Sequence, residues 1–575
     1  MKQAYQSMLQ AGVEKKYRML EEEIMKDVIR RIQKAGKVTS AADWQLQRYM
    51  VLGHSTEDVE AIIRQAVGGD WADTFRLYDE VIEQEYVRSK AMYEQVNAYF
   101  VPYEENHELQ QLTNALVQQS NDELFNITKS LGFMVDMGKG RKEFAPLAEI
   151  YNGYLDNAIT MLASGAFDYN TVIRKVVKEM TASGLRTVDY ATGHSSRVDV
   201  AVRRALLTGM GQLAGRISDM NGQALGTDKF EVDWHPGARP DHAVWQGRVW
   251  TRQQLVDVCG LGTGPGLLGW NCRHTYYPFI EGVSVRNHSD EWLAEMDRKE
   301  AQKVAFRGKG YNAYEATQKQ RQMETAMRAQ REKVQLLKEG GADKDEIMLA
   351  RCKYQAQLDE YREFSRKMNL PEQRERIYYD LRGRVAPRDR SVMRNFPKEM
   401  IENADRDIKQ YERYKDVLGK DAGSLANFGW IKYNDSEGWK YLEGLKGYLE
   451  KYPTSDKRYY DAGERLKGLG IKKGVVLPPV QKQAFILPEG EKDPYHIMNR
   501  MLERNITDDD VRAYMKNAKV MLSQWGGQRQ CFISDEGMCV IAKSGDKWIY
   551  KTVWSKYDFD EESERIMEVL KSVGL

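Results

Sequence analysis

Residues 197–217, RVDVAVRRALLTGMGQLAGRI, place apolar side chains three and four positions apart, which is the spacing of one face of a helix. Around this helix, between about 182 and 282, the chain is rich in Gly, His, Trp and Arg and has only short apolar runs. The runs FEVDWHP and GRVWT are typical of short strands around an irregular loop. We therefore expect a compact central module over residues 186–285.

Longer helical patterns flank this module. Residues 1–185 carry the helical spacing, as in Tyr17, Leu20 and Ile24, and predict a helical arm or bundle. Residues 286–385 predict a helical hairpin or coiled coil, because mostly apolar residues recur at alternating spacings of four and three before a Gly-Gly pair. These positions are Met323, Met327, Gln330, Val334 and Leu337.

The rest of the chain divides near a Pro-Pro pair at 478–479. Residues 386–479 are mixed in composition and predict a connecting region. Residues 480–575 predict a small α+β domain, because two helical runs precede the alternating runs QCFIS, MCVIAK and KWIYKTVW, which are typical of antiparallel strands. The expected fold class is multidomain and mainly α, with a small irregular α+β module in the centre and an α+β domain at the C-terminal end.

Charge and composition restrict the class of protein. The 575 residues carry 86 Lys and Arg against 85 Asp and Glu, so a net charge of +1 gives no overall attraction to nucleic acid or membrane. No run approaches the roughly 20 apolar residues of a membrane span, and the N-terminus lacks the order of a signal peptide. The five cysteines lack CxxC spacing, which indicates thiols in a reducing compartment. We expect a protein made in the cytoplasm, with no membrane partner.

Two dense motifs lie in the central module, WHPGARPDHAVWQGRVW at 234–250 and GLGTGPGLLGWNCRHTYYPFIEG at 260–282. The residue types of a metal or acid–base site occur in both, at His235, Asp241, His242, Cys272 and His274. Guanidinium groups that could hold an anion occur at Arg239, Arg248 and Arg273. The spacing indicates zinc only weakly, because Cys272 and His274 are one residue apart, whereas zinc ligands usually stand two to four apart.

The alternative for the same residues is a buried hydrogen-bonded network that fixes loops poor in regular structure. Trp245 and Trp270 would then supply apolar area, and Gly262, Gly264, Gly266 and Gly269 would let the backbone turn tightly. A nucleotide site is not expected, because no Lys-Ser/Thr pair follows this loop. We expect no cofactor and no bound metal, with His242, Cys272 and His274 as weak metal candidates.

The order of ARPDHAVWQG, GTGPGL, NCRH and YYPF resembles the phage minor capsid protein 2 family, which is related to the Mu F-like head-morphogenesis proteins. The resemblance covers roughly residues 10 to 370. It implies a structural constituent of the virion head, with portal and capsid proteins as partners. The motif falls on His235, Arg239, Asp241, His242, Trp245, Gln246, Gly247, Asn271, Cys272, Arg273 and His274. One departure is Leu261, where the family would have an aromatic residue.

The C-terminal segment has a different resemblance. WIYKTVW at 548–554, with His496 on the helix HIMNRMLERN, resembles the barnase, EndoU, colicin E5 and D and RelE-like group of small RNase toxins. Such domains occur attached to Mu F-like phage proteins. This implies metal-independent cleavage of host RNA and an immunity protein as a partner. The groove would be formed by His496, Arg500, Arg504, Lys551 and Thr552.

The charge of this segment opposes an RNA-binding role. Residues 480–575 carry 14 Lys and Arg against 16 Asp and Glu, a net charge of −2, unlike the basic surface expected of an RNA binder. A degenerate toxin-like fold and an unrelated accessory domain are therefore alternatives to an active nuclease.

Three hypotheses follow. The first is a structural minor capsid protein acting in head morphogenesis near the portal, located in the virion and in the host cytoplasm during assembly. The second is a phage-delivered RNase toxin carried by the capsid module. The third is an internal head protein that contacts packaged DNA through Arg321, Arg328 and Arg331, although a solvated face is the expected role of these arginines.

Overall fold

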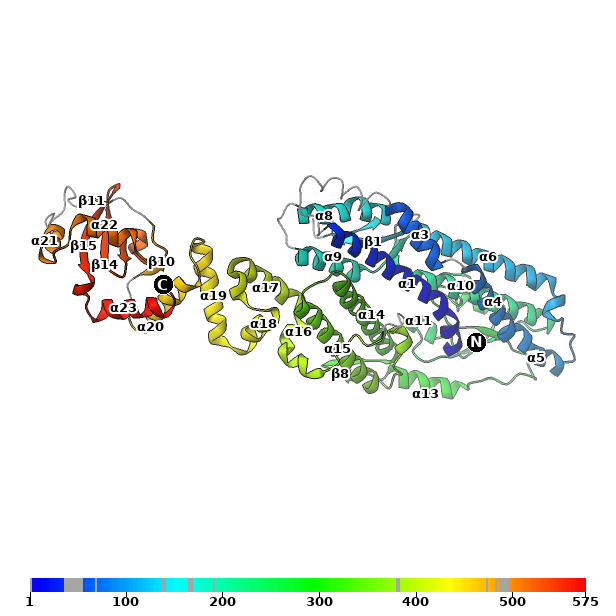
Figure 1. Cartoon of the computed structure of the whole chain (residues 1–575). Helices are drawn as coiled ribbons and strands as arrows, with labels where there is room; N and C mark the ends of the chain where they lie inside the picture. Colours follow the sequence, from blue (N-terminus) through cyan, green and yellow to red (C-terminus); the bar gives the residue numbers. More distant parts are fainter. Residues whose placement is uncertain are drawn as a thin grey trace. The chain divides into compact units, whose positions relative to one another are not determined.

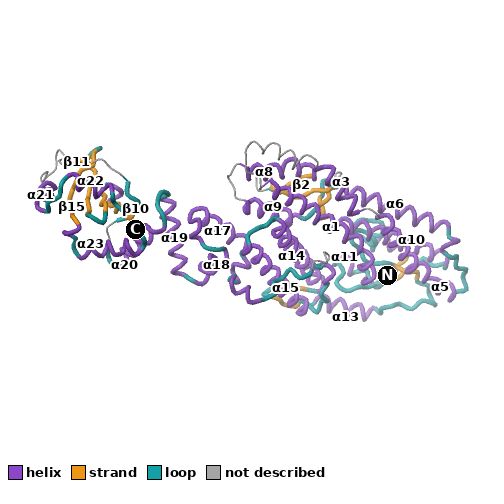
Figure 2. The backbone as a smooth tube through the Cα atoms, viewed as in Figure 1, coloured by secondary structure: helices purple, strands orange, loops and turns teal. Residues whose placement is uncertain are grey.

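The computed structural model divides into two compact units, Met1–Val392 and Met393–Leu575. It describes residues 3–35, 55–67, 70–136, 141–163, 169–189, 192–378, 383–471, 474–480, 484–485 and 496–575. Helices dominate both units, and Figure 2 shows strands in small groups in the first unit and gathered in the second. The predicted multidomain, mainly α fold class is confirmed.

Long helices build the first unit. They are α1 (Gln3–Ala35), α3 (Ser55–Val67), α4 (Asp70–Val81), α5 (Lys90–Gln95), α6 (His107–Lys129), α8 (Leu155–Ala163), α9 (Tyr169–Ser183), α10 (Val198–Ala224), α13 (Asp290–Ala301), α14 (Ala313–Glu339) and α15 (Lys344–Lys367). Shorter helices are α7 (Leu147–Glu149), α11 (Pro240–Ala243) and α12 (Arg252–Asp257). The sequence RVDVAVRRALLTGMGQLAGRI lies at the start of α10, as its spacing predicts.

The core of the first unit surrounds α1, which packs against α3, α10 and α14 (Figure 1). Its apolar stripe is fully buried, including Tyr17, Leu20 and Ile24. The same core takes in α6 and α9. Burial of apolar surface contributes about 25 cal/mol per Å² to the stability of the fold. Because helices far apart in sequence pack against this one stripe, they fold as a single body.

Small sheets complete the first unit. In the residues described they are a four-stranded sheet in the order β2-β1-β3-β4, a three-stranded sheet in the order β6-β5-β7 and the hairpin β8–β9. Their bounds are β1 (Leu131–Asp136), β2 (Lys142–Pro146), β3 (Arg186–Val188), β4 (Ser195–Arg197), β5 (Lys229–Val232), β6 (Val249–Thr251), β7 (Tyr276–Pro278), β8 (Val304–Phe306) and β9 (Lys309–Tyr311). The β1–β2 hairpin interrupts the region 1–185, which the sequence pattern treats as helical throughout.

A buried carboxylate ties three helices of this unit together. Asp199, in the first turn of α10, is 3% exposed. Its carboxylate oxygens lie 3.5 to 3.9 Å from guanidinium nitrogens of Arg328, Arg18, Arg197 and Arg203. Burial alone would raise the pKa of Asp199, but these four cations hold it well below its usual range. The α10 N-terminus also favours a negative charge at this position.

The predicted helical hairpin is formed by α14 and α15, which pack against each other across the turn at Gly340. All five positions of the four-three pattern are buried, so the periodicity correctly identified the packed face. The expectation of a solvated arginine face is wrong for two of its three members. Arg331 is 1% exposed and lies over the rings of Tyr354 and Tyr378, and Arg328 is 8% exposed and paired with Asp199. Burial also removes both from contact with packaged DNA.

The second unit begins with helices α16 (Lys398–Glu402), α17 (Ala404–Leu418), α18 (Leu425–Asn434), α19 (Ser436–Lys451) and α20 (Lys457–Gly468). Tyr414, Phe428 and Leu445 form part of a small core among α17, α18 and α19. Asp407 is fully buried there and accepts hydrogen bonds from Lys432 and Tyr433 at 2.7 and 2.6 Å. The predicted connecting region is thus a packed helical segment.

A mixed sheet forms the rest of this unit, in the order β10-β12-β13-β14-β15-β11 among the residues described. Its elements are β10 (Val475–Leu477), β11 (Ala484–Phe485), α21 (His496–Glu503), α22 (Asp508–Lys516), β12 (Val520–Gln524), β13 (Arg529–Ile533), β14 (Gly537–Ser544), β15 (Lys547–Ser555) and α23 (Glu561–Ser572). The antiparallel pairs β13–β14 and β14–β15 confirm the strands predicted from the alternating runs.

Both faces of this sheet are covered, and the alternation of side chains decides which helices cover each face. Val520 and Leu522 face a core shared with α20 and α23, whereas Met521 between them faces a core shared with α21 and α22. Because α20 and β10 contribute to the first core and the sheet, the packed tail begins before residue 480.

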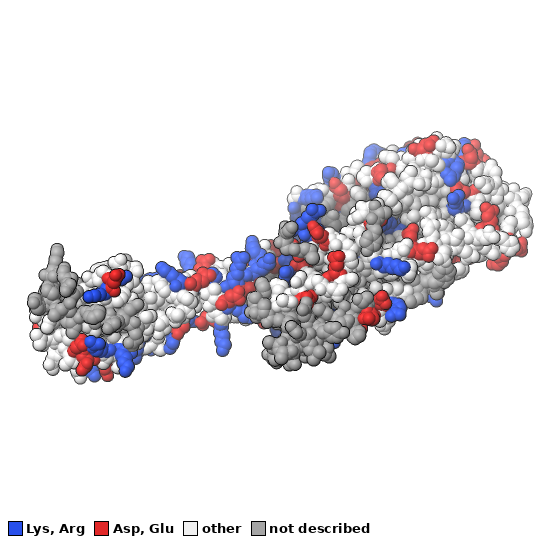
Figure 3. Space-filling model, turned by 90° about the horizontal axis from the view of Figure 1, so that it is seen from above, with Lys and Arg blue, Asp and Glu red and all other residues white. Residues whose placement is uncertain are grey.

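The face seen in Figure 3 carries charges of both signs, and the cysteines are free thiols in the described structure. On the face that Figure 3 shows, Lys and Arg are interspersed with Asp and Glu. All five cysteines are buried, and none of them forms a disulfide bond in the described structure. Over the described residues, no helix combines the length and apolarity needed to cross a bilayer.

We expect Asp199→Asn to destabilise the first unit by about 3–5 kcal/mol, because it leaves buried guanidinium groups without their counter-charge. Urea-dependent hydrogen exchange in peptides of α1 and α10 measures the loss. A lowered pKa means that the wild-type carboxylate stabilises the fold above its unfolded pKa of about 3.9, so the difference between the two proteins should shrink as pH falls below that value.

The matched control is Asp290→Asn, which removes an exposed carboxylate from the first turn of α13. It should change hydrogen exchange far less. Equal effects of the two substitutions would show that the buried network is not what ties the helices together.

Candidate functional site

A cavity of about 740 Å³ lies between the two central motifs and the start of the α14–α15 hairpin. The motif side of its wall includes His235, Arg239, His242, Cys272, Arg273 and His274. The hairpin side and the segment after it contribute Tyr314, Thr317, Arg321, Gln373 and Arg376. The structure thus brings together most of the side chains that the sequence analysis identified, and adds residues from a distant segment.

Strand register places the first pair of these residues. β5 and β7 are antiparallel with Val232 opposite Tyr276, and the pairing continues because Asp233 donates its backbone N–H to Thr275. The chain beyond β5 and the chain before β7 therefore run side by side. Their imidazoles stack, with the ring centroids of His235 and His274 4.0 Å apart.

The second motif element is the short helix α11, which begins at Pro240 and carries His242. His242 is 3% exposed and His274 is 2% exposed. The Nδ1 atoms of these two histidines are 3.3 Å apart. Cys272 Sγ lies 3.8 Å from His242 Nδ1 and 3.6 Å from His274 Nδ1. These three side chains could hold a metal ion, because their ligand atoms all lie within 4.8 Å of one another.

The outer nitrogens of the two imidazoles have acceptors behind them. His274 Nε2 lies 3.0 Å from Gln246 Oε1, and His242 Nε2 lies 2.9 Å from the carbonyl oxygen of Pro265. Arg239 contacts both His242 Nε2 and that carbonyl. Trp245 packs against both imidazoles from one side and is 3% exposed. The cluster is therefore held in place by a buried polar network.

Burial controls protonation in this cluster. Desolvation lowers the pKa of His235 to about 4, and lowers those of His242 and His274 from their ordinary value. It raises the pKa of the Cys272 thiol to about 11. At pH 7 the imidazoles are neutral, so they present lone pairs and not positive charge.

The wall of the cavity is cationic. Arg239, Arg273, Arg321 and Arg376 line it. Burial, together with the charges of Arg321 and Arg376, lowers the pKa of Arg273 to about 9. Arg248, the third predicted anion ligand, instead lies 3.6 Å from Asp290. Crowded guanidinium groups favour an anionic ligand in the cavity.

Other motif residues have local structural roles. Asp241 is exposed and lies 3.5 Å from Arg239. Asn271 is exposed and has a φ of 56°. Gly247 has a φ of 70°, and a Cβ there would come within 2.6 Å of Leu293. Gly247 is thus required by backbone conformation and by close packing together.

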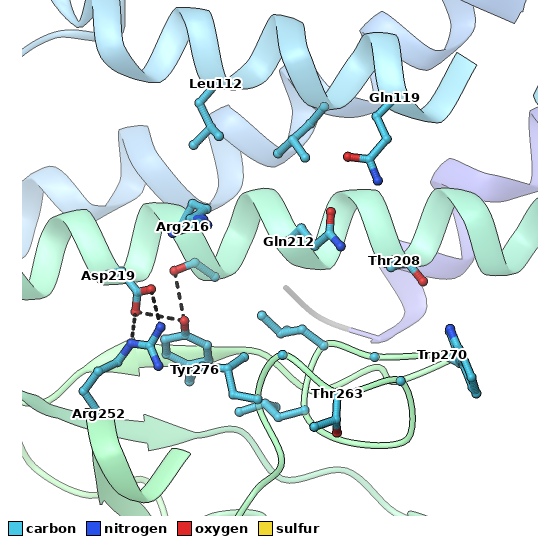
Figure 4. Close-up of a pocket in the computed structure, with 18 residues that line it drawn as sticks. Leu112, Gln119, Thr208, Gln212, Arg216, Asp219, Arg252, Thr263, Trp270 and Tyr276 are labelled. Carbon is cyan, nitrogen blue, oxygen red and sulfur yellow. Dashed lines mark hydrogen bonds and ion pairs between the residues drawn. The ribbon is translucent and has the colours of Figure 1, made fainter. Parts of the chain in front are cut away.

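A second cavity, of about 550 Å³, lies between α6, α10 and the glycine-rich loop 260–270 (Figure 4). Asp219 on α10 is paired with Arg252 at 3.0 Å and accepts a hydrogen bond from Tyr276 at 2.9 Å. Gln212 and Thr208 extend along the same helix above the loop. These ties hold α12 and β7, the elements on either side of the loop, against α10.

Close backbone packing explains the glycines of this loop. A Cβ on Gly266 would lie 2.1 Å from the carbonyl oxygen of Gly260, and one on Gly269 would lie 2.2 Å from that of Gly264. No helix follows the loop until α13, so it does not build a phosphate site at a helix N-terminus. Trp270 is 58% exposed and does not supply the buried apolar area that was expected of it.

The predicted tail residues lie on neighbouring elements. His496 and Arg500 are on α21, which packs on β15, the strand that carries Lys551 and Thr552. Arg504, just after α21, donates a hydrogen bond to the backbone oxygen of Val553. Arg500 is paired with Glu503 at 3.0 Å. The structure therefore brings the helix and the strand together.

Comparison with known families assigns the first unit. The family of phage minor capsid protein 2 matches residues 1–365. This is more than half of the chain, and the chain belongs to this family. No curated protein and no solved structure matches it. The protein is therefore a bacteriophage minor capsid protein, located in the virion with other phage structural proteins. The resemblance of the tail to RNase toxins stays a prediction.

Gly247→Ala should destabilise the central module by more than the roughly 1–2 kcal/mol that a left-handed conformation costs an ordinary residue, because Leu293 must also move. Gly226→Ala is the matched control, since Gly226 has a φ of 69° and open space around its Cβ position. Hydrogen exchange in peptides of β5 and β7 measures both variants. An equal loss in the two variants would contradict the packing role of Gly247.

Proposed function

We propose that residues 1–392 act in head morphogenesis near the portal, and that residues 393–575 are a cargo domain attached to them. The observation that carries this division is that the family match does not extend into the second compact unit. The family match ends at residue 365, inside the first compact unit, and the second unit lies wholly outside the match. Each unit also has hydrophobic clusters of its own.

The construction of the first unit supports a structural role. Its long helices are tied by a core and a buried ion network that run through α1, α10 and α14. Such a body keeps its shape when it is loaded at an interface, because packed interiors deform little. Assembly in the host cytoplasm and contact with portal and capsid proteins are parts of this proposal.

A phage that carries a stop codon after residue 392 tests the division. Heads should assemble and package DNA in normal numbers, and they should contain the truncated protein crosslinked to portal protein. Asp199→Asn in the full-length chain is the opposing variant and should reduce the yield of heads. If the truncation itself prevents head assembly, the cargo assignment is wrong.

For the second unit, an RNase activity is favoured by the position of α21 against β15. Arg504 fixes the end of the helix to the strand beside Thr552, so His496 and Arg500 project from a helix anchored there. A base, cations and a strand lysine are the groups needed for attack by the RNA 2′-hydroxyl and for stabilising the phosphorane. Lys551 has a pKa lowered by burial. This activity would require host RNA as substrate and an immunity protein in the producing cell.

Expression of residues 393–575 tests this second proposal, because α20 and β10 belong to the folded tail and a fragment from 480 would lack them. The wild-type unit should slow growth and degrade total RNA, and His496→Ala should abolish both effects. Arg512→Ala is the control, since Arg512 is an exposed residue of α22 paired with Asp508. A harmless wild-type unit, or equal toxicity after His496→Ala, would contradict the RNase proposal and leave the tail as a structural domain.

A further inference from the structure

We propose that His242, Cys272 and His274 bind one Zn²⁺ ion, with a fourth coordination position that faces the arginine-lined cavity. This site goes beyond the assembly function proposed above and does not depend on it. The three side chains come from two segments, since His242 is on α11 and the other two precede β7. An ion bound there would join α11 to the loop before β7 and fix the floor of the cavity.

The distances among the ligand atoms match those of a tetrahedral zinc site. Bonds of about 2.0–2.1 Å to nitrogen and about 2.3 Å to sulfur, at tetrahedral angles, separate two nitrogens by about 3.3 Å and a nitrogen from a sulfur by about 3.6 Å. The two Nδ1 atoms are 3.3 Å apart, and the sulfur lies 3.6 and 3.8 Å from them. A single ion position can therefore lie at bonding distance from all three ligand atoms.

The groups behind the imidazoles favour the protonation state that zinc requires. Gln246 Oε1 lies 3.0 Å from His274 Nε2 and accepts the backbone N–H of His235 at 3.2 Å. Because that N–H can only donate, the oxygen of the amide is the atom that faces His274. His274 Nε2 must then carry the proton, and its Nδ1 lone pair points at Cys272 and His242. Such an outer acceptor is the usual partner of a metal-bound histidine.

His242 is oriented in the same way. Its Nε2 lies 2.9 Å from the Pro265 carbonyl oxygen, which can only accept, so a proton on Nε2 would be donated to that oxygen and would leave Nδ1 available to a metal. An arrangement without an ion is the competing possibility. In it, His242 Nδ1 donates to His274 Nδ1, and His242 Nε2 accepts from Arg239, which also contacts it. In the first arrangement His242 Nδ1 has a lone pair that can bind a metal, whereas in the arrangement without an ion it carries a proton and cannot.

The cavity determines what completes the coordination. All three ligands line it, so the fourth position is accessible from the cavity, as in sites that keep an exchangeable ligand. Zn²⁺ with one thiolate has a charge of +1, and Arg239, Arg273, Arg321 and Arg376 line the same cavity. An anionic oxygen, such as a hydroxide, a phosphate or a carboxylate, therefore fits the fourth position better than a neutral ligand.

The test is metal binding by the purified full-length chain. After dialysis against Zn²⁺ and removal of unbound metal, elemental analysis should find one zinc per chain. Titration of the metal-free chain with Co²⁺ should give the thiolate-to-cobalt charge-transfer band and the visible absorption of a tetrahedral ion. Cys272→Ser should abolish the charge-transfer band, and Gln246→Ala should weaken Zn²⁺ binding by about 10–100-fold.

Cys259→Ser is the matched control, because Cys259 is a 1% exposed thiol in the same hydrophobic cluster but is not one of the ligands. It should leave the zinc content and the cobalt spectrum unchanged. Near-ultraviolet circular dichroism of the variants checks that the aromatic residues around the site remain packed. The proposal is wrong if a folded wild-type chain binds no stoichiometric metal, or if the charge-transfer band survives Cys272→Ser.

Discussion

The carboxylate of Asp199 is the point on which the first unit depends. It places one negative charge among four guanidinium groups that come from α1, from the start of α10 and from α14. A buried ion network of this kind adds little net stability over apolar packing, but breaking it leaves uncompensated buried charges, which disfavours other arrangements of the elements that contribute to it. In this protein that arrangement puts the α14–α15 hairpin beside the central motifs. The wall of the cavity, including Arg321 and Arg376, follows from it.

Local periodicity was sufficient to predict the helices and strands whose buried residues recur at one regular spacing. It predicted the helix that begins at Val198, the hairpin of α14 and α15, and the three strands β13, β14 and β15. It missed the β1–β2 hairpin because a six-residue apolar run does not distinguish a strand from a buried helix turn. Gly132 was an available signal, since a Cβ there would lie 2.2 Å from the carbonyl oxygen of Ala145. Nonlocal pairing of β10 with β12 was likewise invisible in local composition.

For the candidate site, residue types identified the side chains that meet, whereas spacing within one segment could not show which of them lie together. Cys272 and His274 are one residue apart, which argues against zinc when ligands are sought within one segment. The third side chain, His242, lies on α11 in a different segment. The β5–β7 register that brings the segments together cannot be read from the spacing of residues in the sequence. The arginines of the hairpin were expected in solvent, because a helical charge pattern does not reveal a buried counter-charge such as Asp199. Burial of Arg328 and Arg331 is a property of the tertiary fold.

The central claim is that residues 1–392 fold as one body that does not require residues 393–575. Comparison of amide hydrogen exchange between Met1–Val392 alone and the full-length chain tests it most directly. The account predicts the same protection in peptides of α1, α10 and α14 in both proteins. Loss of protection in the shorter protein would contradict the division into two units, and with it the separation of a virion body from an attached domain.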